Sequence, residues 1–111
     1  MCNYSVVIID DEPWTREVVK HLGRWKELGL TIAGEASDGD LGLEMVRELR
    51  PDIILTDVRM PYLNGIDLVR TLRAEHNEAQ VIFFSGYDDS SYIRSALRLG
   101  AADYLLKPIK P

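Results

Sequence analysis

The sequence is poor in cysteine, in long apolar runs and in basic residues, and each shortage excludes a class of protein. Its single cysteine, Cys2, leaves no internal disulfide and no cysteine-based metal site. No apolar stretch approaches the length of a membrane span, and the first residues lack the basic and apolar regions of a signal peptide. The 13 basic residues are outnumbered by 18 acidic ones, and a net charge of −5 disfavours direct binding of nucleic acid. We therefore expect a cytoplasmic protein that contacts neither membrane nor nucleic acid through this chain.

The chain does contain enough apolar residues for one modest core. Its 111 residues are 46% hydrophobic and 28% charged, as is usual for a globular domain. Short apolar runs predict five strands, at Tyr4–Ile9, Leu30–Ala36, Ile53–Thr56, Gln80–Phe84 and Tyr104–Leu106. Amphipathic segments between them predict four helices, with apolar stripes of Trp14, Val18, Leu22 and Trp25; Leu41, Met45, Val46 and Leu49; Ile66, Val69 and Leu72; and Tyr92, Ile93, Ala96 and Leu97. We expect both tryptophans to be covered.

The alternation of strands and helices predicts an α/β fold with a doubly wound parallel sheet, because right-handed crossovers join successive parallel strands. We expect five strands in the order 2-1-3-4-5, which is the flavodoxin-like arrangement. Such a sheet usually carries one more helix after its fifth strand, but the sequence stops at Pro111. We therefore expect residues 1–111 to form one domain without its last helix, with apolar surface bare on one flank, and to be a fragment of a longer protein.

Acidic residues directly follow two of the predicted strands. Asp10, Asp11 and Glu12 follow the first strand, and Asp57 follows the third. The expected strand order places these two strands side by side, so at least three carboxylates meet at the carboxyl edge of the sheet. Like charges this close together are unfavourable without a cation, and oxygen-only ligands favour Mg²⁺. The sequence therefore predicts a magnesium site at Asp10, Asp11 and Asp57.

Two further strand ends bring polar side chains to the same edge, with Ser85 after the fourth strand and Lys107 after the fifth. A carboxylate beside Mg²⁺ can act as a nucleophile toward a phosphoryl group. Asp57 would attack phosphorus in line, the Lys107 ammonium would pair with one phosphoryl oxygen, and the Ser85 hydroxyl would donate a hydrogen bond to another. The pattern predicts phosphoryl transfer to Asp57.

Four motifs span the chain in order. They are Ile9-Asp10-Asp11-Glu12; Asp57-Val58-Arg59-Met60-Pro61 with Gly65; Ser85-Gly86-Tyr87; and Asp103-Tyr104-Leu105-Leu106-Lys107-Pro108. Together they resemble the receiver domain of a two-component response regulator. A further likeness, in Trp25–Leu30 and Ala36–Gly39, is to the subset whose effector is an AraC-type DNA-binding domain.

This resemblance implies a role for each acidic residue of the predicted site. Asp57 matches the phosphoacceptor of the family. Asp11 matches the direct metal ligand, and Asp10 matches the acid that usually acts through a metal-bound water. Arg59 matches the position whose backbone carbonyl binds the metal. The implied metal site is therefore Asp10, Asp11, Asp57 and Arg59, with Mg²⁺ as the cofactor.

The resemblance also implies a switch. Ser85 matches the hydroxyl that moves toward the phosphoryl group, and Tyr104 matches the aromatic residue that follows it. Lys107 matches the phosphate-contacting lysine, and its bond to Pro108 is typically cis in the family. The resemblance therefore implies that Asp57, Lys107 and Ser85 are the catalytic residues of phosphoryl transfer.

The partners implied by the resemblance are a sensor histidine kinase and a C-terminal effector domain, which is absent from this chain. DNA would be contacted through that effector alone, and phosphorylation would favour a homodimer. The domain would catalyse its own phosphorylation and dephosphorylation and no other reaction, so we expect a signalling switch rather than an enzyme.

Two other functions use similar residues. A phosphohydrolase with an aspartate nucleophile would carry a second acid two residues later, where this chain has Arg59. A flavodoxin-type nucleotide module would need a glycine- or hydroxyl-rich loop after the first strand, where Asp10, Asp11 and Glu12 would repel a phosphate. The sequence disfavours both.

Overall fold

The computed structural model describes residues 4–22, 25, 27–86 and 90–107. Four residues named above lie outside these ranges: Cys2, Tyr87, Pro108 and Pro111. Strands and helices alternate along the described residues: β1 Tyr4–Ile9, α1 Pro13–Leu22, β2 Leu30–Ala36, α2 Gly39–Leu49, β3 Ile53–Thr56, α3 Gly65–Ala74, β4 Gln80–Ser85, α4 Ser90–Arg98 and β5 Asp103–Leu106. None of these helices is long and apolar enough to cross a bilayer.

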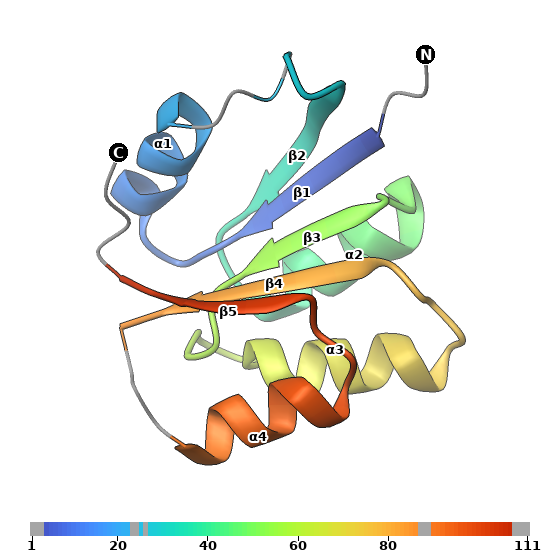
Figure 1. Cartoon of the computed structure of the whole chain (residues 1–111). Coiled ribbons are helices and arrows are strands. Elements are labelled where there is room, and N and C mark those ends of the chain that lie inside the picture. Colours follow the sequence, from blue (N-terminus) through green and yellow to red (C-terminus); the bar gives the residue numbers. More distant parts are fainter. Residues whose placement is uncertain (1–3, 23–24, 26, 87–89, 108–111) are drawn as a thin grey trace.

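The five strands form one parallel sheet in the order β2-β1-β3-β4-β5 (Figure 1). This confirms the predicted flavodoxin-like fold. The bounds of β1, β2 and β3 are those expected from the sequence, while β4 extends one residue further, to Ser85, and β5 begins one residue earlier, at Asp103. Because β1 and β3 are neighbours at the centre, the acidic residues that follow them meet at one edge.

Helices cover the two faces of the sheet unequally. On one face α2, α3 and α4 enclose the larger core, which includes Val7, Ile54 and Phe83 (Figure 1). On the other face Val19 of α1 packs with buried strand residues in a smaller cluster. Leu105 of β5 is 41% exposed. Leu106, the next residue of β5, is 48% exposed, so two leucines of this edge strand are open to solvent among the described residues, and the absence of a covering helix stays a prediction.

Helix α2 approaches the sheet through small residues. Its buried residues include Gly42 and Val46. A Cβ atom on Gly42 would lie 2.8 Å from the Ile9 side chain, so the missing side chain lets the helix lie this close to β1. The prediction that Leu41 and Leu49 belong to the buried stripe of this helix is wrong, because they are 49% and 43% exposed.

The face of α1 that packs on the sheet differs from the apolar stripe predicted from the sequence. Val19 is 6% exposed and faces the strands, whereas Trp14 is 78% exposed. Each residue turns the helix by about 100°, so side chains five positions apart point about 140° from each other. Trp25 lies beyond the end of α1, where it is half-buried and its indole N–H donates to the Lys20 carbonyl at 3.1 Å. The expectation that both tryptophans are covered is therefore wrong for Trp14.

Candidate functional site

Backbone hydrogen bonds that continue the sheet place three polar residues at its carboxyl edge. The N–H of Asp10 donates to the carbonyl of the last residue of β2 at 3.0 Å. The N–H of Asp57 donates to the last residue of β1 at 2.9 Å, and that of Lys107 to the last residue of β4 at 2.8 Å. Each of the three side chains therefore starts from a backbone position fixed by its neighbouring strand.

The Lys107 ammonium lies among three carboxylates. Its Nζ atom is 2.7 Å from Asp10 Oδ2, 3.0 Å from Asp57 Oδ2 and 3.2 Å from Glu12 Oε1. It also lies 5.5 Å from the centre of the Phe84 ring. The structure thus brings together Asp10, Asp57 and Lys107, which the sequence placed at three different strand ends. It adds Glu12, whose place in the acidic run after β1 was the signal for it.

Burial and ion pairing shift the pKa values of Asp10, Asp57 and Lys107. Asp10 is fully buried and Asp57 is 5% exposed. Burial raises the pKa of Asp10 to about 6, although the Lys107 ammonium, 2.7 Å away, acts in the opposite direction. Burial likewise raises the pKa of Asp57, again against the pull of Lys107. Burial lowers the pKa of Lys107, but the contacts with Asp10 and Asp57 outweigh it and raise that pKa. The ammonium is therefore charged at neutral pH.

The donor set at this edge suits a hard cation. Asp10, Asp11, Glu12 and Asp57 each offer a carboxylate oxygen, and these oxygens lie within 4.8 Å of one another. The buried Asp10 Oδ2 has Lys107 as an ion-pair partner but no hydrogen bond among the described residues. An all-oxygen set with an incompletely satisfied carboxylate fits Mg²⁺. Arg59 is exposed, and the role of its backbone carbonyl as a ligand stays a prediction.

The loop after β3 holds Asp57 in place. Asp57 Oδ1 accepts from the N–H of Val58 at 2.7 Å, and the Asp57 carbonyl accepts from the Thr56 hydroxyl at 2.9 Å. The N–H of Gly65 donates to the Val58 carbonyl at 2.7 Å. A Cβ atom on Gly65 would lie 2.0 Å from the Asp57 carbonyl oxygen, which no real side chain tolerates. Glycine at this position therefore lets the start of α3 pack against the acidic loop.

The two predicted switch residues lie on β4 and β5. Ser85 is the last residue of β4 and is fully buried. Tyr104 is half-buried against the larger core, and its ring centre lies 6.2 Å from that of Phe83 at an interplanar angle of 39°. Ser85 therefore lies at the carboxyl edge of the sheet, whereas Tyr104 pairs with Phe83 two residues before the end of β5. Their movement on phosphorylation stays a prediction.

The charges at this edge set the order in which ligands can bind. Four carboxylates face one ammonium, so the edge attracts a cation and repels a free phosphate. A bound divalent cation would reverse that repulsion and leave Lys107 able to pair with phosphoryl oxygens. The arrangement is suited to phosphoryl chemistry on a carboxylate.

Comparisons with known proteins agree with this site. The family model of the response regulator receiver domain matches residues 6–111. A response regulatory protein of Staphylococcus epidermidis is 39% identical over 106 residues, which cover 96% of this chain and 41% of that protein. The transcriptional regulatory protein HptR of Staphylococcus aureus is 36% identical over 106 residues, with 96% and 41% covered. The chain thus spans about two fifths of the length of these relatives.

The fold of this chain also matches that of a solved receiver domain structure. The REC domain of AraT, a response regulator from Geobacillus stearothermophilus, matches with a TM-score of 0.91 at 35% identity, and the match covers 99% of this chain and 85% of that one. Sequence family, relatives and fold therefore agree over almost the whole chain. The chain belongs to the response regulator receiver domain family, and it is the receiver domain of a two-component response regulator.

Proposed function

We propose that this receiver domain accepts a phosphoryl group on Asp57 from a sensor histidine kinase and thereby controls an attached output domain. The observation that carries the proposal is the position of Asp57. It is buried at the carboxyl end of the central strand, 3.0 Å from the Lys107 ammonium and within the group of four carboxylates. The other three carboxylates lack this direct place at the end of β3.

In the proposed reaction an Asp57 carboxylate oxygen attacks the phosphorus atom in line. The bond from phosphorus to the nitrogen of the donor histidine breaks, and that nitrogen keeps the electron pair. The Lys107 ammonium exchanges its ion pair with the Asp57 carboxylate for one with a phosphoryl oxygen. The Ser85 hydroxyl donates a hydrogen bond to another phosphoryl oxygen. Water later attacks the same phosphorus, the bond from phosphorus to the Asp57 oxygen breaks, and inorganic phosphate leaves the restored carboxylate.

The residues that would hold Mg²⁺ are Asp10, Asp11 and Asp57, together with the backbone carbonyl of Arg59. When bound, the cation neutralises charge on the phosphoryl oxygens. Asp11 is exposed and able to bind it directly, whereas the buried Asp10 is already paired with Lys107. Asp11→Asn should therefore weaken Mg²⁺ binding more than Asp10→Asn, as measured by calorimetric titration of the unphosphorylated protein. An equal loss in both variants would contradict this assignment.

The switch would run from Ser85 to Tyr104. The phosphoryl group adds negative charge and acceptor oxygens, so Ser85 moves toward them and the Tyr104 ring takes the space that is vacated. The surface of α4 and β5 then changes its preferred partner. The resemblance to other receiver domains implies that the new partner is a second phosphorylated copy of this domain.

The output domain is proposed from the relatives. Because the chain spans 41% of the length of HptR, which is named as a transcriptional regulatory protein, we propose that residues 1–111 are the receiver part of a longer cytoplasmic regulator. Its effector would be an AraC-type domain, supported by the likeness in Trp25–Leu30 and Ala36–Gly39. DNA would be bound through that effector.

Treatment with acetyl phosphate and Mg²⁺ tests the central step. Intact mass spectrometry should show one added phosphoryl group on the wild-type protein and none on Asp57→Asn. The label should disappear from the isolated protein with time, because the domain hydrolyses its own aspartyl phosphate. Full labelling of Asp57→Asn would contradict the assignment of the acceptor.

A further inference from the structure

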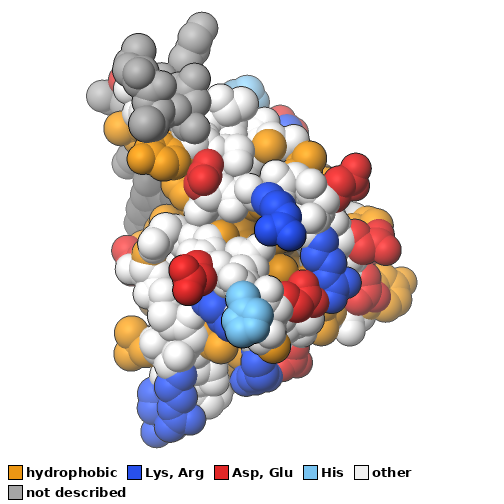
Figure 2. All heavy atoms as spheres, turned by 90° about the vertical axis from the view of Figure 1, so that its right-hand side faces the viewer, with side chains coloured by type: hydrophobic (Ala, Val, Ile, Leu, Met, Phe, Trp, Pro, Cys, Tyr) orange, Lys and Arg blue, Asp and Glu red, His pale blue; other side chains and the backbone are white. Residues whose placement is uncertain are grey.

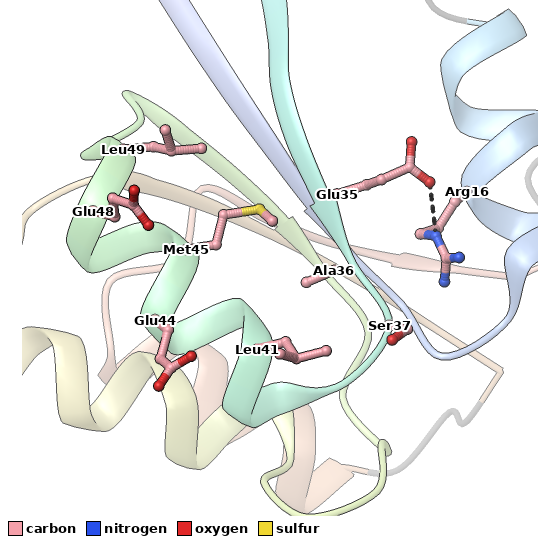
Figure 3. Close-up of a pocket in the computed structure, with 9 residues that line it drawn as sticks. All are labelled: Arg16, Glu35, Ala36, Ser37, Leu41, Glu44, Met45, Glu48 and Leu49. Atoms are coloured by element: carbon pink, nitrogen blue, oxygen red, sulfur yellow. Dashed lines mark hydrogen bonds and ion pairs between the residues drawn. The ribbon is translucent and has the colours of Figure 1, made fainter.

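A groove of about 380 Å³ lies between α2 and β2, outside the acidic site (Figure 3). Strand β2 forms one edge of the sheet and, among the described residues, pairs with β1 alone. The proposed phosphoryl chemistry uses no side chain from α2 or β2. The groove is therefore a surface for which the function proposed above gives no explanation.

The wall of the groove is an apolar ridge on α2. Leu41, Met45 and Leu49 follow each other at intervals of one helical turn and point toward β2, over a length of about 12 Å (Figure 3). Gly34 of β2 makes room for them, because a Cβ atom there would lie 2.7 Å from Met45 Sδ and 3.3 Å from Leu49 Cδ1. The ridge therefore packs against β2, although Leu41 and Leu49 remain 49% and 43% exposed.

The rim of the groove carries unpaired negative charge. Glu44 and Glu48 lie one helical turn apart beside the apolar ridge, and both are exposed (Figure 3). Neither forms an ion pair within the described part of the chain, since the nearby Arg47, which Glu44 attracts electrostatically, is paired with Glu75. Glu35 differs from them, because Arg16 Nε lies 2.9 Å and Lys20 Nζ 2.7 Å from its carboxylate oxygens. Two carboxylates on α2 are therefore available to a cationic partner.

We propose that this groove docks an amphipathic helix of a partner protein, with large apolar side chains one turn apart and lysine or arginine on either side of them. An apolar ridge beside a strand is the geometry that helix-in-groove recognition uses, and the acidic rim selects the charge of the partner. A second copy of this chain fits poorly, because a two-fold axis would bring Glu44 and Glu48 of both copies together. Anionic lipid is repelled by the same charges.

Arg16 joins the groove to the acidic site. Its Nε atom donates to Glu35 at 2.9 Å, and its Nη1 atom donates to the carbonyl oxygen of Asp10 at 2.6 Å. A cationic side chain that competes for Glu35 changes the hydrogen bond at the Asp10 carbonyl, and the change reaches the N–H of Asp11. Docking is therefore visible at the acidic site without any phosphorylation of Asp57, and its failure would leave the proposed phosphoryl transfer untouched.

The first test uses two synthetic helical peptides of about 18 residues, or five turns, with the same leucine spacing. One has lysine at the flanking positions and the other has glutamate. The lysine peptide, added to the isotopically labelled chain, should shift the resonances of Leu41, Met45 and Leu49 and the amide of Asp11. The glutamate peptide should shift none of them. Equal binding of both peptides, or shifts confined to other faces, would overturn the proposal.

Matched variants at exposed positions sharpen the test. Glu48→Lys should weaken binding of the lysine peptide about tenfold, whereas Glu78→Lys, an exposed acid outside the groove, should change it less than twofold. Leu49→Ser should weaken binding, whereas Leu97→Ser on α4, where the side chain is 69% exposed, should not. Equal effects within either pair would overturn the proposal, as would self-association of the chain through this groove.

Discussion

Strand β3 carries an aspartate at each end, and the two differ in burial and in partners. Asp52 precedes the strand, is exposed, and accepts a hydrogen bond from the N–H of Ser5 at 2.8 Å. Asp57 follows the strand, is 5% exposed, pairs with Lys107 at 3.0 Å, and has a pKa raised by burial. The side chains are chemically identical, so the difference comes from the polarity of the parallel sheet. At its carboxyl edge the ends of β1, β3 and β5 converge on one site.

The largest effect is expected from filling the space beside Asp57. Gly65→Ala would place a Cβ atom 2.0 Å from the Asp57 carbonyl oxygen, whereas a Cβ atom on Gly86, after β4, would meet nothing within 4 Å. We expect Gly65→Ala to lower the free energy of unfolding by about 3 kcal/mol or more, and Gly86→Ala to change it by less than about 1 kcal/mol. Urea denaturation of both variants measures this. Equal stability of the two would show that the acidic loop is not held as described.

Removing the ammonium that pairs with Asp57 should slow phosphoryl transfer to this aspartate. We expect Lys107→Ala to slow labelling by acetyl phosphate about 10- to 100-fold, because a preorganised charge at the phosphoryl oxygens is lost. Lys20→Ala is the control, since Lys20 pairs with Glu17 and Glu35 instead. A time course by intact mass spectrometry compares the two variants. Unchanged labelling in Lys107→Ala would mean that the ammonium serves structure alone.

The acidic edge should also make stability depend on pH. The pKa of Asp10 is raised from 3.8 to about 6, so between these values the folded chain binds more protons than the unfolded chain. The contribution of Asp10 to stability therefore falls as pH rises from about 4 through about 6. In the absence of Mg²⁺, Asp10→Asn should be more stable than the wild type at about pH 7.5, by about 1–2 kcal/mol, and this advantage should shrink as the pH falls through about 6 and disappear near about pH 4.

Urea denaturation with a chelator present, at several pH values, checks this prediction. A lower stability of Asp10→Asn at the highest pH would show that the ion pair with Lys107 outweighs the cost of burying the carboxylate.

The smallest effect is expected at the other end of β3. Asp52→Ala removes the hydrogen bond to the N–H of Ser5, which is exposed to water, so the free energy of unfolding should fall by about 1 kcal/mol or less. The rate of labelling by acetyl phosphate should not change. A loss of labelling in Asp52→Ala, with the fold intact by circular dichroism, would remove the distinction between the two aspartates.

The sheet and its acidic edge were predictable from local patterns. Runs of β-branched residues gave the bounds of β1, β2 and β3, and the strand order then required Asp10 and Asp57 to meet. Lys107 was predictable because it directly follows the fifth apolar run. These inferences succeed because a parallel strand sets both the position and the direction of the residue that follows it.

The helix faces were harder to predict, because apolar stripes count large side chains alone. Gly42 brings α2 against Ile9 and leaves Leu41 exposed, although leucine has the stronger apolar signal. Glu12 was recognised as part of an acidic run but not as a partner of Lys107, since that contact depends on side-chain rotamers over 95 residues of sequence separation. Close packing and rotamers are set by the whole fold rather than by local sequence.

The most direct test is to locate the phosphoryl group on the chain. Borohydride reduction of the aspartyl phosphate converts the modified aspartate into homoserine, which peptide mass spectrometry finds by position. After labelling with acetyl phosphate and Mg²⁺, we predict homoserine at Asp57 and none at Asp52, Asp10 or Asp11. Homoserine at Asp52, or at Asp10 or Asp11 with Asp57 unmodified, would contradict the central role given to the carboxyl end of β3.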